Sequence, residues 1–234
     1  KELENSIQQT TSTKREEIFL SASAINTYEN CPLKFRLSQI DGVPQTANKP
    51  ELVFGNIIHK VLQRFHEPNK PLTKKRILNI LDEEWREDEF EYSVREKKFK
   101  EQGVELLKEY IHFIDDNKPN VLKREKVFEF NIEHINIRGV IDRIDKTMDG
   151  TAIIDYKTSK TISSAKSNLQ LAIYSMYLEQ TNEQDISGLP INASLHFLRE
   201  YDNPIRSHTF KKEELLAIQK KNNGSCQWYS TKKV

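Results

Sequence analysis

The chain reads Gly139-Val140-Ile141-Asp142-Arg143-Ile144-Asp145 and, a few residues later, Ile153-Ile154-Asp155-Tyr156-Lys157-Thr158. Both segments are rich in β-branched residues, as strands are. Asp149-Gly150 between them is a strong signal for a two-residue hairpin turn, in which both residues take a positive φ. The pattern therefore predicts an antiparallel hairpin with Asp142 opposite Lys157 and Ile144 opposite Asp155.

The predicted hairpin brings two acids and a lysine to one face of the sheet. Side chains alternate between the two faces of a strand, so Asp155 and Lys157 share a face while Tyr156 points away. The register adds Asp142 to that face and leaves Asp145 on the other. Buried carboxylates need compensation, and a hard divalent cation such as Mg²⁺ or Mn²⁺ suits oxygen ligands. The segment thus predicts a metal site of the kind that activates water for attack on a phosphate.

A second interpretation of the hairpin stays open at this point. Asp-x-Lys is a common triplet, and the same pattern fits an edge hairpin whose acid and lysine form an exposed cross-strand ion pair. The hairpin alone does not separate the two interpretations.

The composition describes one sizeable globular domain. The chain has 234 residues, of which 36% are hydrophobic and 30% charged, and no apolar run approaches the roughly 18 residues that span a bilayer. The formal net charge is only +1, so any nucleic-acid contact must be local. Candidate basic stretches are Lys70–Arg76, Lys97–Lys100 and Lys157–Lys166, although solvated helix faces account for most of these charges.

The two cysteines indicate neither a disulfide scaffold nor a complete cysteine metal site. Cys31 and Cys226 are far apart in sequence and neither belongs to a Cys-x-x-Cys pair, which fits a reducing cytoplasm. The chain has no Gly-x-x-x-x-Gly-Lys-Ser/Thr loop, so these residues do not form a P-loop ATPase. Because the first residue is Lys1 and no charged-then-apolar leader follows it, we interpret the chain as a piece of a longer polypeptide, and a missing partner domain has to be considered.

Histidines flank a predicted helix upstream of the hairpin. Residues 52–65 carry apolar side chains at the spacing of one buried helical stripe, and His59 lies on its flank, where a side chain can reach a neighbouring cleft. His66 lies on the same flank two turns later. Further upstream, Ser21 or Ser23 can cap a helix that runs to about Leu33, with a bend at Cys31-Pro32.

The remaining patterns predict an α/β fold of the α+β type, with a mixed sheet flanked by helices. Residues 1–19 are polar and resemble a disordered tail or linker, and residues 20–234 form a single domain. The expected elements are a helical insertion at about 73–118, strands at 127–132, 135–144, 152–157 and 191–198, and helices at 163–179 and 211–220.

Five motifs in order resemble the RecB-like branch of the PD-(D/E)XK nucleases, and more narrowly the nuclease domain at the C-terminus of UvrD/Rep-type DNA helicases. They are the segment from Leu20 to Phe35 with its Cys31-Pro32, Phe54-Gly55-Asn56-Ile57-Ile58-His59, Gly139–Asp145, Asp155-Tyr156-Lys157-Thr158 and Gln170-Leu171-Ala172-Ile173-Tyr174. The match runs from about residue 20 to 200. It implies a restriction-endonuclease-like core with a catalytic hairpin and helix at about 125–200.

The resemblance assigns roles to individual residues. It implies Mg²⁺ or Mn²⁺ ligands at His59, Asp142, Asp155 and the main-chain carbonyl of Tyr156, and thereby selects His59 over His66. Asp142, Asp155 and Lys157 are the implied catalytic centre, with Gln170 and Tyr174 supporting the lysine. Gln170, Tyr174 and Lys160 are the implied substrate contacts. Either Glu125 or Glu129 matches an upstream glutamate of the family, and the sequence does not choose between them.

One departure from the family concerns its iron–sulfur cluster. Many relatives hold a 4Fe–4S cluster with a cysteine at the position of Cys31, a C-terminal Cys-x-x-Cys and one more cysteine. Here Cys226-Gln227-Trp228-Tyr229 keeps one cysteine and has Tyr229 where the next is expected. We therefore expect no cluster on these residues, and a buried thiol at Cys31.

The function implied is that of a metal-dependent DNA nuclease in DNA repair or recombination, an exonuclease on single strands or DNA ends. DNA and a helicase motor in the same polypeptide or complex are the expected partners, in the cytoplasm at the nucleoid. Two alternatives stay open. One is a catalytically silent DNA-binding module of a helicase, and the other is a stand-alone endonuclease of the restriction class.

Overall fold

The structure is a computed structural model that describes residues 19–44, 49–86, 90, 93–116, 118–133 and 135–231. The side chains of Ser93 and of residues 222–231 lie outside that description, and so does the predicted tail apart from Phe19. The expectations for the side chains of Cys226 and Tyr229 therefore fall outside the described residues.

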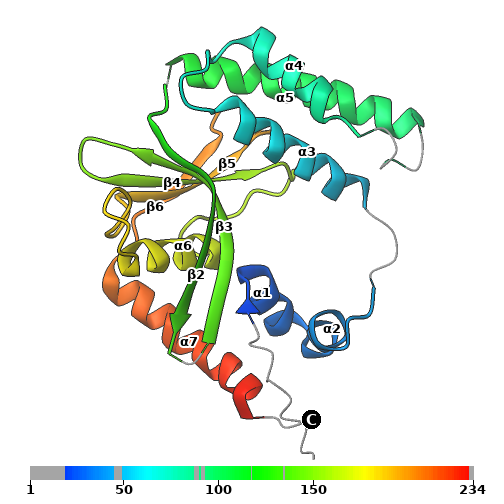
Figure 1. The fold of residues 1–234 in the computed structure, drawn as a ribbon. Coiled ribbons are helices and arrows are strands. Elements are labelled where there is room, and N and C mark those ends of the chain that lie inside the picture. The colour runs from blue at the N-terminus through cyan, green and yellow to red at the C-terminus, as the bar shows by residue number, and fades with distance from the viewer. Residues whose placement is uncertain are drawn as a thin grey trace, which may run out of the picture.

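A six-stranded mixed sheet forms the centre of the described chain (Figure 1). Its strands are β1 (Phe19–Leu20), β2 (Val121–Ile132), β3 (Ile135–Lys146), β4 (Thr151–Lys157), β5 (Asn192–Phe197) and β6 (Ile205–His208). The order is β1-β3-β4-β5-β6, and β2 pairs with β3. β1 and β3 are parallel, as are β4 and β5, while the other pairs are antiparallel. The predicted mixed sheet is confirmed.

Helices cover both faces of the sheet and enclose two hydrophobic cores (Figure 1). On one side lie α3 (Pro50–Phe65), α4 (Lys74–Glu84) and α5 (Ser93–Asp116), which pack on Ile154 and Tyr156. On the other lie α1 (Ala22–Asn30), α6 (Leu169–Gln180) and α7 (Lys212–Thr231), which pack on Ile144 and Ile153. The sheet is therefore the middle layer of three.

Capping residues set several helix boundaries. Ser21 caps α1 by accepting the main-chain NH of Ala24 at 3.2 Å. Cys31 ends α1 and begins the short α2 (Pro32–Phe35), which continues as the π-helical η1 (Arg36–Ile40). The expectation of a buried thiol is wrong, because Cys31 is exposed. Asn168 caps α6, so this helix starts six residues later than the predicted residue 163.

The hairpin between β3 and β4 has a different register from the predicted one. Ile144 lies opposite Ile153, and Arg143 lies opposite Ile154, so Asp142 does not face Lys157. The loop is longer than two residues, with Thr147 donating its main-chain NH to the Gly150 carbonyl at 2.8 Å. Gly150 has a positive φ of 149°, and Asp149 does not. The slip is an even number of residues, so the acids keep their predicted face.

Two strands and two extensions were not predicted. β1 has two residues and β6 has four, too few for alternation to be recognised in sequence. β2 begins at Val121 instead of residue 127, and α7 runs on to Thr231. Four consecutive charged residues, 123–126, interrupt the alternating pattern of β2.

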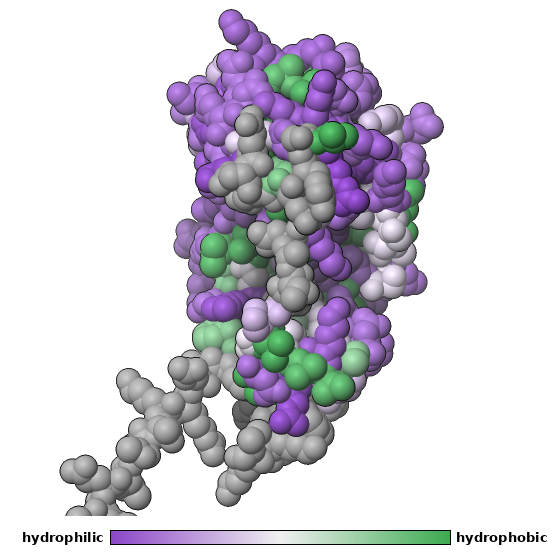
Figure 2. All heavy atoms as spheres, turned by 90° about the vertical axis from the view of Figure 1, so that its right-hand side faces the viewer, coloured by the Kyte–Doolittle hydropathy of each residue, from purple (hydrophilic) through white to green (hydrophobic). Residues whose placement is uncertain are grey.

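A cluster of exposed apolar side chains lies on α2, on η1 and just after it. Leu33, Leu37, Ile40 and Val43 are 63%, 42%, 46% and 50% exposed. Figure 2 shows hydrophobic atoms gathered low on the face turned to the viewer and mostly hydrophilic surface above them. None of the described helices combines the length and the apolar character that a membrane span requires.

Candidate functional site

The site lies where β3 and β4 separate. Their pairing runs from Lys146 opposite Thr151 to Arg143 opposite Ile154 and ends there. One step further, the Oδ2 atom of Asp142 accepts the main-chain NH of Tyr156 at 2.7 Å. A side chain thus takes the place of a ladder hydrogen bond, which holds the two strands apart at a fixed distance and fixes the Asp142 carboxylate.

Glu125 enters this fork from β2. It lies between the pairs Arg124–Arg143 and Lys126–Ile141, and its φ of 44° is in the left-handed region that non-glycine residues seldom adopt. Such local strain is typical of functional positions. Glu129 is exposed and does not line the cleft, whereas Glu125 does. The sequence did not choose between these two glutamates, and in the structure it is Glu125 that lies at the cleft.

His59 reaches the fork from α3. The apolar stripe of this helix is buried, and the flanking His59 places its Nδ1 3.3 Å from the Oδ1 of Asp142. Burial lowers the pKa of this imidazole, but the hydrogen bond to Asp142 and the charges of Asp142 and Asp155 raise it, and the net shift is upward. Of the two flank histidines predicted from the sequence, His59 lines the cleft and His66 is buried.

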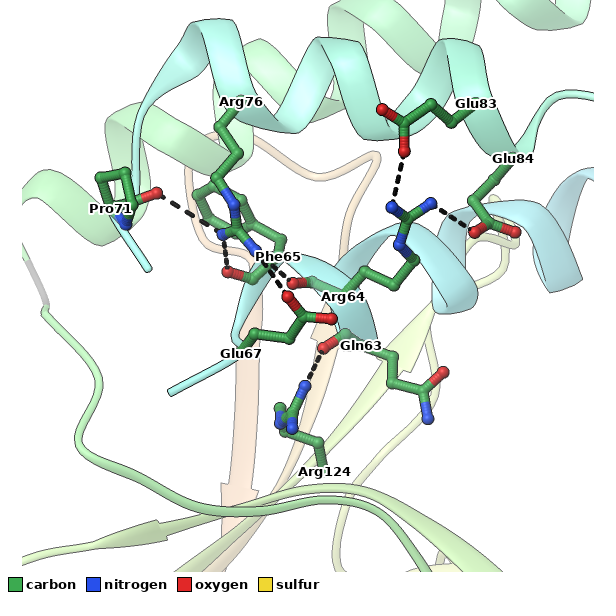
Figure 3. Close-up of polar contacts among 9 residues, drawn as sticks. All are labelled: Gln63, Arg64, Phe65, Glu67, Pro71, Arg76, Glu83, Glu84 and Arg124. Carbon is green, nitrogen blue, oxygen red and sulfur yellow. Dashed lines mark hydrogen bonds and ion pairs between the residues drawn. The ribbon is translucent and has the colours of Figure 1, made fainter. Parts of the chain in front are cut away.

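Arginines anchor the C-terminal end of α3 (Figure 3). Arg124 on β2 donates to the Gln63 carbonyl at 2.8 Å, and Arg76 on α4 donates to the carbonyls of Phe65 at 2.5 Å and Arg64 at 2.6 Å. Cationic donors suit the free carbonyls of a helix C-terminus. Since Arg124 precedes Glu125, the same contact fixes the helix that carries His59 relative to the strand that carries Glu125.

Three side chains at the fork are arranged as a possible metal site. One ligand atom each from His59, Glu125 and Asp142 lies within 4.8 Å of the others. Burial and the nearby Asp142 charge raise the pKa of Glu125 to about 7, and they raise that of Asp155 to about 6. Within the described chain, the buried Oδ2 of Asp155 makes no hydrogen bond of good geometry, although the Lys157 Nζ lies 2.6 Å away. This excess of buried carboxylate fits a divalent cation.

A chain of polar contacts holds Lys157. Its Nζ donates to the Gln170 Oε1 at 2.9 Å, and the Gln170 amide donates to the Tyr174 hydroxyl at 2.6 Å. The Tyr174 hydroxyl donates to the Val140 carbonyl at 2.5 Å, on the part of β3 that β4 does not pair with. Gln170 and Tyr174 come from successive turns of α6, as predicted, and together they tie the lysine back to β3.

The cleft around the fork has a volume of about 700 Å³. The predicted residues that line it are His59, Asp142, Asp155, Tyr156, Lys157 and Gln170. Tyr174 is buried behind Gln170 and does not line the cleft, and Lys160 lines a neighbouring groove instead.

A buried polar network beneath the site was not anticipated from the sequence. Arg143 donates to the hydroxyls of Tyr110 at 2.8 Å and Tyr156 at 2.6 Å, and its Nε lies 3.0 Å from Asp145. His66 joins the network through the Tyr110 hydroxyl at 2.5 Å. Burial and the Arg143 charge lower the pKa of His66 to about 3. Alternation along β3 places Asp145 on the face opposite Asp142, as expected from the sequence, and it places Arg143 there too.

Known proteins resemble this chain in sequence. A family model described as "PD-(D/E)XK nuclease superfamily" matches residues 19–227. Two relatives, from Streptococcus mutans and Streptococcus agalactiae, are each named as a component of an ATP-dependent helicase/deoxyribonuclease and are 28% and 27% identical over 151 residues. These alignments cover 60% of this chain and 14% of each relative, so the chain corresponds to a small part of those proteins.

The similarity to solved structures concerns the fold alone. The crystal structure of a "Putative exonuclease" from Eubacterium rectale superposes with a TM-score of 0.55 and 11% sequence identity, covering 90% of this chain and 79% of that one. At this level of identity the superposition supports the architecture of the chain and assigns no role to its residues.

Proposed function

Because the chain belongs to the PD-(D/E)XK nuclease superfamily, we propose that it is a metal-dependent nuclease that hydrolyses phosphodiester bonds of DNA. The observation that carries the proposal is the meeting of His59, Glu125 and Asp142 in one cleft with Asp155 and Lys157. An exposed cross-strand ion pair is a poor explanation of these residues, because Asp155 is 1% exposed.

The proposed ligands of the metal are His59, Asp142, Asp155 and the main-chain carbonyl of Tyr156, and the fork geometry favours adding Glu125. Mg²⁺ and Mn²⁺ suit this set of oxygen and imidazole ligands. A cation bound there lowers the pKa of a water and stabilises negative charge on a phosphate. The hydrogen bond from the Tyr156 NH to Asp142 keeps that carboxylate oriented before any ligand arrives.

Lys157 is the side chain that we propose supplies a catalytic positive charge besides the metal. Its ammonium group lies between Asp155 and Gln170, at 2.6 Å and 2.9 Å. There it can position the attacking water and offset charge that builds up on the phosphate. Gln170 lines the cleft and can donate to a phosphate oxygen, whereas Tyr174 acts through Gln170 as a positioning residue.

The proposed substrate is DNA with single strands or ends, and the proposed partner is a helicase motor. The names of the relatives combine a helicase with a deoxyribonuclease, which supports DNA as the substrate and a helicase as the partner. Single strands and ends are the forms of DNA that such a motor would present to the cleft. A catalytically silent DNA-binding module would not need a buried acid beside a half-buried lysine at the fork. That pairing favours the enzyme over the silent module.

Product analysis tests the proposal. Labelled linear single strands, circular single strands and duplexes are incubated with Mn²⁺ and the protein, beside Asp155→Ala and Lys157→Ala. We expect the wild-type protein to degrade linear single strands, and both variants to lose about 10²-fold or more in rate. Equal cleavage by all three proteins would assign the activity to a contaminant, and DNA binding without cleavage by the wild type would support the silent module.

A further inference from the structure

A second groove continues from the catalytic cleft. It also has a volume of about 700 Å³ and lies between α3, the N-terminal half of α5 and the segment that follows β4. The cleft and the groove share four lining residues, Glu51, Leu52, Thr158 and Ser159. A chain-like ligand that occupies the cleft can therefore pass over Thr158 and Ser159 into the groove without crossing a ridge of other residues.

The lining of this second groove is basic. Among its described lining residues are the cations Arg95, Lys98, Lys160 and Arg199 and one acid, Glu51. The whole chain has a formal net charge of only +1, so positive charge is concentrated here. Lys98 and Lys160 are exposed, and they come from different elements, one from α5 and one from the segment after β4. Such a concentration of charge attracts a polyanion.

Several contacts hold the floor of the groove together. Arg199 donates from its Nε to the Thr158 carbonyl at 2.6 Å and from a terminal nitrogen to Gln102 at 3.1 Å, and its guanidinium lies 5.2 Å above the Phe54 ring. α3 also approaches this floor closely, because a Cβ on Gly55 would lie 3.2 Å from the Thr158 Oγ1. The passage between the two cavities is therefore formed before a ligand binds.

Apolar side chains line the groove beside the cations. Leu52 is 61% exposed and Phe99 is half-buried, and both belong to the lining. Grooves that combine cations for the backbone with apolar or aromatic surface for the bases are typical of single-strand binding. The bases of a duplex are stacked and paired, so they could not reach such surface.

We propose that a single strand of DNA runs from the catalytic cleft into this groove, with its phosphates at Lys98 and Lys160 and its bases against Leu52 and Phe99. The inference rests on the proposed nuclease function, since it takes DNA as the substrate of the neighbouring cleft. It adds a binding subsite and a direction: the strand leaves the fork over Thr158 and Ser159 towards α5.

The test is a salt titration of binding by fluorescence anisotropy, in EDTA so that no cleavage occurs. The probes are a labelled 20-nucleotide oligothymidine and a 20-base-pair duplex. The protein is compared with the double variant Lys98→Ala/Lys160→Ala and with Lys118→Ala/Lys146→Ala, which removes the same charge from exposed lysines outside both cavities. Circular dichroism confirms that each variant is folded.

For the single strand, we expect the slope of log K against log salt to fall by about 1.4 in the groove variant, because each single-strand phosphate contact contributes about 0.7. The control variant should keep the wild-type slope. Equal slopes for the two double variants would overturn the proposal, and so would a loss of duplex binding as large as the loss of single-strand binding.

Cleavage of the same oligonucleotide in Mn²⁺ by the wild-type protein separates this inference from the proposed function. If the wild type cleaves and the groove variant binds like the control, the proposal of a single-strand groove is contradicted and the proposed nuclease function is kept. If the wild type does not cleave but the groove variant loses single-strand affinity, the single-strand groove is supported and the proposed nuclease function is contradicted.

Discussion

The carboxylate of Asp142 accepts the main-chain NH of Tyr156 at 2.7 Å, and this contact is made where the ladder between β3 and β4 has ended. One acid therefore both shapes the fork and supplies a negative charge to it. The contact also orients the peptide of Tyr156, whose side chain is held from the opposite face by Arg143. The two roles of Asp142 can be separated by substitution.

Asp142→Asn keeps an acceptor for the Tyr156 NH and loses the charge, whereas Asp142→Ala loses both. We expect Asn to leave the free energy of unfolding within about 1 kcal/mol of wild type, and Ala to lower it by about 1–3 kcal/mol because a largely buried NH loses its partner. Urea unfolding measures both values. Equal destabilisation by the two substitutions would show that the hydrogen bond does not hold the fork.

Glu125→Gln and Glu129→Gln form a matched pair on β2. Only Glu125 lies within reach of His59 and Asp142, so we expect Glu125→Gln to weaken Mn²⁺ binding at least about tenfold and Glu129→Gln to leave it unchanged. Isothermal titration with MnCl₂ gives the affinities directly. Unchanged affinity in Glu125→Gln would remove Glu125 from the site, and an equal loss in Glu129→Gln would show that the effect is not specific to Glu125.

The buried pair Arg143–Asp145 predicts non-additive effects on stability. Arg143→Met leaves the Asp145 carboxylate buried without its partner and should cost about 3–5 kcal/mol. Adding Asp145→Leu should restore part of that loss, since no unpaired charge then remains. The three free energies come from urea unfolding. A double variant less stable than Arg143→Met would show that the carboxylate is not the cause.

His66 predicts a loss of stability in acid. Its pKa in the folded protein is about 3, below its ordinary value of about 6.5. Below pH 6.5 the imidazole is therefore protonated in the unfolded chain but stays neutral in the folded protein. The contribution of His66 to the free energy of unfolding is complete above pH 6.5 and is lost as the pH falls towards 3. Between pH 8 and pH 5 the wild type should lose up to about 2 kcal/mol more than His66→Gln.

The comparison with His66→Gln is needed because other groups change the stability with pH in the opposite direction. Glu125 and Asp155 have raised pKa values, so the folded protein binds their protons first and gains stability as the pH falls. Both proteins share that effect, and it cancels in the difference. Identical pH profiles for the two proteins would contradict a neutral, buried His66.

The faces of the strands could be predicted from the sequence, but their register could not. An alternating pattern fixes which side chains share a face, and an even slip of the β3–β4 pairing leaves Asp142, Asp155 and Lys157 together. The loop length depends on tertiary contacts of the hairpin that no local pattern encodes. The same limit applies to β1, which forms only because β3 offers an edge at Asn136 and Ile137.

The role of Glu125 could not be predicted from a sequence motif. Its role depends on a positive φ and on the separation of β3 from β4, neither of which local sequence specifies for a glutamate. Helical periodicity alone placed His59 and His66 on the same flank, and only the family resemblance selected His59. The bend at Cys31-Pro32 was predicted, but local sequence does not show that the Cys31 side chain stays exposed at the start of α2.

The most direct test of the fork as a nuclease metal centre is the rate of cleavage of a labelled linear single strand as a function of Mn²⁺ concentration, for the wild type and Asp142→Asn. We expect no cleavage in EDTA, a saturable rise with Mn²⁺ for the wild type, and a rate at least about 10²-fold lower for the folded variant at every concentration. Cleavage by Asp142→Asn at the wild-type rate, or cleavage that persists in EDTA, would contradict a metal centre at the fork.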